Sequence, residues 1–482
     1  MGKEILSTNR KALQINLQDN IYGSFAEIGG GQEVARQFFL AGGASGTVAK
    51  TVSAYDKLFS DWMYNENKSG RYVSGSRLAK MLNTEFREVT SLLQNKRTNP
   101  TCFFAFANTV TTINYQKDNY SHGWIGMHFQ IEPGTPPNKA VLHVNLLEND
   151  PILQQQTLGI LGVNLVWACY HKYTQPNEFL QSLLDNLSAD RVEITMIRMN
   201  GPQMDYVDNR LLSVQLVKNG MTSATMFDRN GNVQQPADML YKKNVLAFRG
   251  SFRPITYVGF DMLKTSYRMF KKDEDYDRNN TLALCEMTLN NLLEMGDLDE
   301  RDFLARVDLL TGMGQNVMIS NFREYYKLVS YFSRFRINNL RIVIGIPTFL
   351  NVLDKKYYVN LKGGIFEAFG KLFVENMKLY VYPTVSSVSV EDKDTMGTLI
   401  TSKNIPLPGD LKFLYKYLIR NGKILDLKEI KKEWLYINSA NVLNMIHRSQ
   451  PGWEKMVPRY VEKTIKAKNL FGYLTDAEKT EN

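Results

Sequence analysis

The chain has 482 residues, of which 44% are hydrophobic, 11% aromatic and 22% charged, and its formal net charge is +9. A chain of this length is too long to fold around a single hydrophobic core, so we expect two or three domains. The composition excludes a collagen-like or broadly disordered chain. Residues 321–482 contain 26 Lys and Arg but only 16 Asp and Glu, whereas residues 1–320 are nearly neutral. The C-terminal third is therefore basic, and its surface either docks an anionic partner or is simply solvated.

Residues 1–238 are predicted to form an N-terminal α/β domain that carries a β-hairpin insertion. The hairpin follows from two alternating segments that are joined by the turn PGTPPN. The expected elements, in chain order, are a strand at 24–28, helices at 33–39 and 48–55, hairpin strands at 124–131 and 140–146, helices at 158–170 and 178–187, a strand at 191–198, a helix from the N-cap Asp208 to Gly220, and a strand at 222–227. The last three elements have the order of a parallel βαβ unit.

Residues 239–384 are predicted to form a second, Rossmann-like α/β domain, because its strands are nearly continuous apolar runs. We expect strands at 245–249, 316–320, 341–346 and 378–382 and helices at 260–270, 281–295, 303–310, 322–335 and 365–374. A linker is expected over 385–410 and a basic helical region over 411–482. The predicted fold class is α/β, with mostly parallel, Rossmann-like doubly wound sheets in two segments and a small helical C-terminal tail.

Two glycine turns in the first domain are predicted to bind a phosphate-bearing cofactor. In SFAEIGGGQEVAR, a strand, Gly29-x-Gly31 and a helix start follow one another, which lets phosphates approach backbone N–H groups. In GGASGTVAKT, Lys50 follows Gly46 by four residues, whereas the lysine of a Walker A loop is adjacent to the glycine. The predicted contacts are Gly29, Gly31, Gly43, Gly46 and Lys50. The alternative is that both turns are structural.

The segment VLAFRGSFRPITYVG at 245–259 resembles the G-x-F-x-P-x-H-x-G-H signature of nucleotidyltransferases such as nicotinate-nucleotide adenylyltransferase. Thr256 stands at the position of the first histidine and the second histidine is missing, so the pair that stabilises the phosphates in that family is absent. The carboxyl end of a strand is the usual ligand edge of such sheets. We therefore predict an anion site at Arg249, Gly250, Ser251 and Arg253.

Two further groups of residues are candidates for chemistry. The loop RMNGPQMDYVDNR contains Asp205 and Asp208, which are predicted to be catalytic or to hold Mg²⁺, with helix capping by Asp208 as the alternative. His122, His128 and His143 fall on the predicted hairpin, and His128 and His143 are expected to be cross-strand neighbours. Because no third ligand and no H-E-x-x-H helix is present, a structural role is favoured over a metal site.

Cysteines and apolar runs bear on the compartment. The three cysteines lie far apart in apolar segments, which argues against a disulfide framework. The N-terminal stretch has no apolar h-region, and the run at 158–170 is too short to cross a bilayer. We expect a cytoplasmic protein without a membrane span, and no motif predicts sequence-specific nucleic-acid binding.

Several segments together resemble one widespread, largely uncharacterised bacterial family, whose members carry the names nicotinate-nucleotide adenylyltransferase or TonB-dependent receptor. They are FAEIGGGQEVARQFF from Phe25, GRYVSGSRLAKML from Gly70, LGILGVNL from Leu158, VLAFRGSFRPIT from Val245 and GGIFEAFGKLFVENMKLYVYP from Gly363. A barrel receptor needs a signal peptide and many alternating strands, which this sequence lacks. The resemblance covers most of the chain and implies one evolutionary unit, but it supplies no mechanism.

Two functions are compatible with these patterns. The first is binding of a nucleotide or a phosphorylated metabolite with Mg²⁺, in support of phosphoryl or nucleotidyl transfer. Backbone N–H groups, Arg249, Arg253 and Lys50 are expected to provide the electrostatic stabilisation, which makes Arg253 a third catalytic candidate beside the two aspartates. The alternative is a non-catalytic scaffold or self-assembling subunit, which predicts a homo-oligomer. Non-specific binding of RNA or a membrane surface by the C-terminal lysines ranks last, because acidic residues are interleaved with them.

Overall fold

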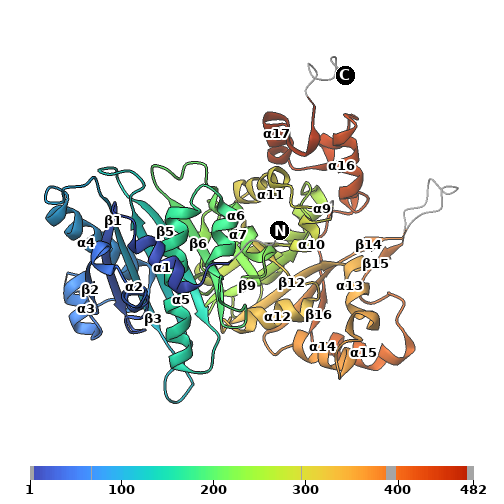
Figure 1. The fold of residues 1–482 in the computed structure, drawn as a ribbon. Coiled ribbons are helices and arrows are strands. Elements are labelled where there is room, and N and C mark those ends of the chain that lie inside the picture. Colours follow the sequence, from blue (N-terminus) through green and yellow to red (C-terminus); the bar gives the residue numbers. More distant parts are fainter. Residues whose placement is uncertain (1–4, 67, 295, 387–397, 475–482) are drawn as a thin grey trace. The chain divides into compact units, whose positions relative to one another are not determined.

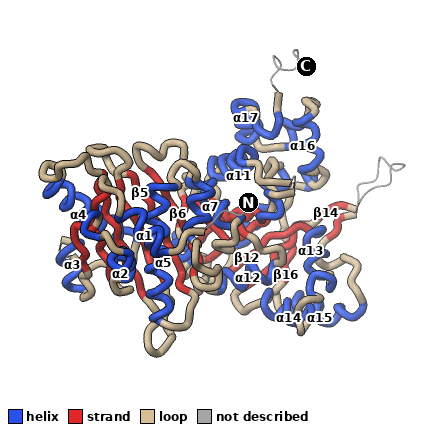
Figure 2. Tube along the Cα trace, viewed as in Figure 1, coloured by secondary structure: helices blue, strands red, loops and turns tan. Residues whose placement is uncertain are grey.

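The computed structural model describes residues 5–66, 68–294, 296–386 and 398–474. The chain forms two compact units, Met1–Thr225 and Met226–Asn482, and each is described by itself (Figure 1). Both contain helices and strands (Figure 2). The domain boundaries expected at residues 238, 384 and 410 stay predictions.

The first unit is built on a six-stranded sheet in the order β2-β1-β3-β4-β5-β6. β1 pairs in parallel with β2 and with β3, whereas the pairs β3/β4, β4/β5 and β5/β6 are antiparallel. The strands are β1 (Ile21–Ile28), β2 (Val48–Val52), β3 (Cys102–Thr111), β4 (His122–Phe129), β5 (Asn138–Leu146) and β6 (Val192–Asn200). The predicted hairpin is therefore the β4–β5 pair, and it lies inside the sheet.

Helices cover both faces of this sheet, because neighbouring residues of a strand point to opposite sides. Phe25 of β1 packs in the core that α1, α2 and α5 share, whereas its neighbour Ala26 packs with Leu78 and Leu82 of α4. The helices are α1 (Thr8–Asn16), α2 (Glu33–Ala41), α3 (Lys57–Tyr64), α4 (Gly75–Leu93), α5 (Pro151–His171), α6 (Pro176–Leu183) and α7 (Asn209–Lys218).

The second unit is built on an eight-stranded sheet in the order β16-β13-β12-β9-β10-β11-β7-β8. The strands are β7 (Ala224–Phe227), β8 (Val233–Gln234), β9 (Asn244–Arg249), β10 (Thr281–Thr288), β11 (Asn316–Ser320), β12 (Asn339–Gly345), β13 (Met377–Tyr382) and β16 (Ile424–Asp426). All pairs from β16 to β11 are parallel. Counted from β9 along the chain, these six strands follow the Rossmann order 3-2-1-4-5-6.

The remaining elements of the second unit are mostly the crossovers of this sheet. They are α8 (Pro236–Leu240), α9 (Tyr257–Phe270), α10 (Leu289–Leu292), α11 (Glu300–Gly312), α12 (Tyr325–Ser333), α13 (Ile346–Leu353), α14 (Gly364–Leu372), α15 (Lys412–Arg420), α16 (Ser439–His447), α17 (Arg459–Lys468) and the two-stranded ribbon β14 (Thr384–Val385) with β15 (Leu399–Ile400). Part of the expected linker, 387–397, lies outside the described residues. None of the described helices combines the length and apolar character that crossing a bilayer requires.

The predicted α/β class is confirmed, and four local predictions are wrong. The segment 48–55 is a strand, β2, because Val48–Val52 pairs with β1. The segment 281–295 begins with β10, because LALCEM has helical propensity but lies buried between β9 and β11. The βαβ unit expected at 191–227 does not form, since β6 and β7 belong to different sheets. The region expected to be helical after 411 also supplies β16, which extends the second sheet beside β13.

Candidate functional site

The first glycine turn follows β1 and leads into α2. Gly29 has φ +91°, and a Cβ there would lie 1.8 Å from the carbonyl oxygen of Val110. Gly31 has φ +77°, with no atom within 4 Å of the position of a Cβ. The first glycine is therefore needed for close packing against β3 and the second for its left-handed backbone.

A carboxylate of the protein itself occupies the start of α2. Glu27 accepts hydrogen bonds from the backbone N–H groups of Ala35 at 2.9 Å and Val34 at 3.3 Å, and from Nδ2 of Asn108 at 2.9 Å. Burial raises the pKa of Glu27 to about 7, while these hydrogen bonds act in the opposite direction. Two of the backbone donors at the start of α2 are therefore already engaged, and phosphate binding at Gly29 and Gly31 stays a prediction.

The second glycine turn contains Gly43 and ends in the 3-10 turn Ala44–Gly46. Lys50, on β2, forms ion pairs with Glu85 at 2.9 Å and with Glu88 at 2.8 Å. Burial acts to lower the pKa of Lys50, but the two carboxylates outweigh it and raise the pKa. A phosphate at Lys50 would therefore compete with two glutamates of α4, and the predicted role of Gly43, Gly46 and Lys50 is untested.

Asp208 is the N-cap of α7, as its alternative interpretation predicted. Its carboxylate accepts from the backbone N–H of Arg210 at 2.8 Å and pairs with the guanidinium of Arg210 at 2.7 Å. Burial acts to raise the pKa of Asp208, but the hydrogen bonds from Arg210 lower it below its ordinary value. Asp205 is exposed in the same loop. Both aspartates belong to the first unit, whereas Arg249 and Arg253 belong to the second.

The expectation that His128 faces His143 across the hairpin is wrong. The register pairs His128 with Lys139 and His143 with Trp124, so His143 meets His122 diagonally. Nδ1 of His122 lies 3.1 Å from Nε2 of His143, whose Nδ1 lies 2.6 Å from the hydroxyl of Thr195. Burial lowers the pKa of His122 to about 4 and that of His143 to about 3. In the described part of the chain no three His, Cys, Asp or Glu side chains are grouped as a metal site requires.

In the second unit, Arg249 ends β9 and is bound by a carboxylate of β10. Its Nε and Nη2 donate to both oxygens of Glu286, at 2.7 and 2.8 Å, and its Nη1 donates to the carbonyl of Arg323 at 2.9 Å. Glu286 is fully buried and also accepts from the hydroxyl of Ser320 at 2.5 Å. Because a guanidinium fork matches a carboxylate so well, a ligand anion at Arg249 would have to displace Glu286.

Arg253 lies in the loop between β9 and α9 and shares a carboxylate with a second arginine. Nε of Arg253 donates to Asp302 at 2.7 Å, and Arg306 binds the other oxygen of Asp302. Nη1 of Arg306 also donates to the carbonyl of Ser251 at 3.2 Å, while its buried Nε has no hydrogen-bond partner among the described residues. Burial lowers the pKa of Arg306. Two guanidinium groups and one carboxylate therefore meet at the predicted loop, and two of the three come from α11.

Two helices begin at the point where the strand order reverses. α9 follows β9 with Thr256 as its N-cap, and α13 follows β12 with Gly345 as its N-cap. Neither N-cap residue makes a side-chain hydrogen bond to its helix, and neither first turn contains an acidic residue. Since β9 and β12 are parallel neighbours, both helix N-termini lie at the same edge of the sheet. Backbone N–H groups and helix dipoles there favour an anion.

Sequence reasoning missed Glu286, Asp302 and Arg306. A signal for Glu286 was present, because an acidic residue inside the apolar run LALCEM requires a buried partner. The helix predicted over 281–295 conceals this signal, because a helix can turn such a residue to solvent. Arg306 and Asp302 lie four residues apart on α11, and nothing in their local pattern points to the loop after β9.

No protein-family model matches the chain, and no curated protein matches it either. Among solved structures, one that is similar is the competence/damage-inducible protein CihA from Agrobacterium tumefaciens, at 14% identity over 34% of this chain and 98% of that chain, with a TM-score of 0.25. Another is the nicotinic acid mononucleotide adenylyltransferase of Plasmodium falciparum complexed with APC, at 11% identity over 48% of this chain and 98% of that chain, with a TM-score of 0.30. At these scores neither similarity carries an argument about function.

Proposed function

We propose that the second unit binds a nucleotide or another phosphorylated metabolite at the carboxyl edge of its sheet, between β9 and β12. The observation that supports this proposal most is the strand order, because open parallel sheets hold ligands where that order reverses. The helix starts at Thr256 and Gly345 add backbone donors to this edge. The dipoles of the two helices supply partial positive charge at the same place.

The arginines have a supporting role in this proposal. Arg249 and Arg253 each bind a buried or half-buried carboxylate, so they shape the loop rather than contact the ligand. The backbone N–H groups at the N-termini of α9 and α13 make the direct contacts with the phosphate. Transfer of a phosphoryl or nucleotidyl group would then depend on these donors and on Mg²⁺ carried by the ligand.

The test places a carboxylate where the phosphate is expected. In Thr256→Asp the new side chain occupies the N-cap of α9, and in Gly345→Asp it occupies the N-cap of α13, where a Cβ meets only Pro347 at 3.7 Å. Aspartate is a favourable N-cap residue, so both variants are expected to fold. Ser7→Asp, at the N-cap of α1 in the first unit, makes the same charge change elsewhere.

Ligand binding is measured as the thermal shift of the chain with ATP, GTP, NAD, nicotinate mononucleotide or polyphosphate, with and without Mg²⁺. A ligand at 100 times its dissociation constant adds about 2.7 kcal/mol, which raises the melting temperature by several degrees. We expect one nucleotide to give this shift in the wild type and in Ser7→Asp, and both other variants to lose it. A shift that survives in Thr256→Asp and Gly345→Asp, or no shift with any ligand, contradicts the proposal.

A further inference from the structure

The first unit contains a cavity of about 770 Å³ that the function proposed for the second unit does not involve. It lies where α3 and α4 meet the end of the β4–β5 hairpin. The side chains that carry the argument are Trp62, Lys80, Phe86, Arg87, His128 and Lys139. Its volume is within the range of small-molecule sites, about 300–1,000 Å³.

Three cations line this cavity, and two of them have no partner. Among the described residues, neither the guanidinium of Arg87 nor the ammonium of Lys139 makes a hydrogen bond or an ion pair. The ammonium of Lys80 donates to Oδ1 of Asn65. The carboxylate in the lining, Glu66, is paired with Lys68 at 3.2 Å. The cavity therefore has an uncompensated positive charge.

The spacing on α4 explains why these cations converge. Lys80, Thr84 and Arg87 are separated by four and three residues, so they lie on one face of the helix. The opposite face of α4, with Leu78 and Leu82, packs on the sheet. Lys139 joins the same site from β5. Like charges that line one cavity repel one another, and an anion bound between them would relieve this repulsion.

A buried imidazole reaches the cavity from the sheet. His128 is only 4% exposed, lines the cavity, and makes no hydrogen bond through its ring within the described residues. Burial, reinforced by the charge of Lys139, lowers the pKa of His128 to about 4, so the ring is neutral at pH 7 and offers one donor and one acceptor. A ligand atom at this point could pair with the donor or the acceptor of the ring.

Aromatic side chains provide the apolar surface of the cavity. Trp62 on α3 is 64% exposed, and the ring of Phe86 meets that of His128 edge-on, with the centroids 6.2 Å apart. An exposed indole beside guanidinium and ammonium groups is a stacking surface for a planar ring that carries negative charge.

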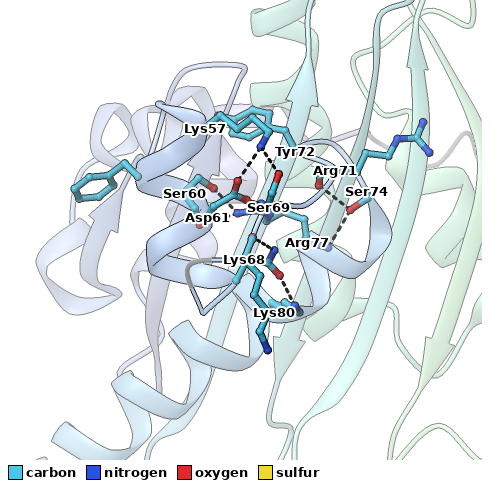
Figure 3. A network of polar contacts seen from close by, with 12 residues as sticks. Lys57, Ser60, Asp61, Lys68, Ser69, Arg71, Tyr72, Ser74, Arg77 and Lys80 are labelled. Carbon is cyan, nitrogen blue, oxygen red and sulfur yellow. Dashed lines mark hydrogen bonds and ion pairs between the residues drawn. The ribbon is translucent and has the colours of Figure 1, made fainter.

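A buried ion pair holds α3 in place for this role. Arg77 of α4 donates to the carbonyl and hydroxyl of Ser60 at 2.6 and 2.8 Å and pairs with Asp61, which Lys57 also binds at 2.8 Å (Figure 3). Lys57 and Arg77 hold the pKa of Asp61 below its usual value. Trp62, the next residue, is therefore carried by a helix turn whose position is set by buried contacts.

We propose that this cavity is a second ligand site, which binds a nucleoside monophosphate or a similar planar ring that bears a phosphate. Arg87 and Lys139 bind the phosphate, Trp62 stacks on the ring, and His128 makes a hydrogen bond to the ligand. Arg87 is the best phosphate donor of the set, because its planar fork binds two oxygens at once.

The test is calorimetric titration of the full chain with AMP, GMP, CMP and UMP, and with adenosine and inorganic phosphate as the two halves of AMP. We expect at least one monophosphate to bind more tightly than either half. Arg87→Ala and Lys139→Ala should each weaken that binding at least about tenfold, since each removes a charge-assisted contact. Lys96→Ala, which removes an exposed charge just beyond α4 and outside the cavity, should change it less than about twofold.

Further variants keep the outcomes separate. Trp62→Ala should weaken AMP at least about tenfold and leave inorganic phosphate nearly unchanged, because stacking acts on the ring alone. The proposal is overturned if no monophosphate binds up to about 5 mM. It is equally overturned if binding is insensitive to Arg87→Ala and Lys139→Ala but lost in Thr256→Asp, which would assign the nucleotide to the second unit. A single-stranded oligonucleotide that binds about 100-fold tighter than any monophosphate would show an extended strand as the true ligand instead.

Discussion

Replacing Arg249 by methionine is expected to lower the free energy of unfolding by about 3–5 kcal/mol, the cost of breaking a buried ion pair from one side. The structure supports the upper part of this range. The substitution removes two hydrogen bonds to Glu286, at 2.7 and 2.8 Å, and the contact of the guanidinium with the ring of Tyr325 at 4.3 Å. Glu286 has no exposed surface and would keep only the hydroxyl of Ser320.

Urea unfolding at pH 7, followed by far-UV circular dichroism and tryptophan fluorescence, measures this loss. With a dependence on urea of about 2–3 kcal/mol per molar, a loss of 3–5 kcal/mol moves the midpoint of the transition down by about 1–2 M. Arg249 lies in the second unit, so where the two units unfold in separate transitions only that of the second unit should move.

The matched control is the double variant Arg249→Met/Glu286→Leu. It removes both charges, so it should recover most of the stability that the single variant loses. A single variant whose midpoint equals that of the wild type would refute the reasoning. So would a double variant that is no more stable than the single one.

Two further predictions concern the first unit. The folded-state pKa values of His122, about 4, and His143, about 3, lie below the ordinary value near 6.5, so their contribution to stability is complete above pH 6.5 and is lost as the pH falls toward 4. Melting temperatures between pH 7.5 and 4.5 should fall in the wild type and fall less in His122→Gln; equal slopes would contradict this origin. Gly29→Ala should cost at least about 2 kcal/mol in urea unfolding, because its Cβ would lie 1.8 Å from the oxygen of Val110, whereas Gly31→Ala should cost only the left-handed strain of about 1 kcal/mol. Equal losses in the two alanine variants would show that packing against Val110 is not the cause.

Local patterns were sufficient for much of the fold. The alternating segments around PGTPPN became β4 and β5, and the apolar runs at 245–249 and 316–320 became β9 and β11. Asp208 caps α7 as the residue type at that place indicates. These features depend on interactions within a few residues, which the order of side chains along the chain specifies directly.

Features that depend on distant segments had to come from the folded chain. LALCEM is a good helix former, yet it lies between β9 and β11, where two neighbouring backbones satisfy its hydrogen bonds. The assignment of β6 and β7 to different sheets, and of β16 to the edge beside β13, follows from which strand edges remain open after the other strands have paired. No local pattern records that choice.

The candidate sites divide in the same way. The sequence placed Arg249 and Arg253 at the carboxyl end of a strand, and both lie there. Other features of these sites depend on segments that lie far apart in the sequence. One is the pairing of the two arginines with Glu286 and Asp302. Another is the convergence of Arg87, His128 and Lys139 on one cavity. The partner, the burial and the protonation state of a charged side chain depend on which distant residues pack around it, and the order of residues along the chain does not specify these neighbours.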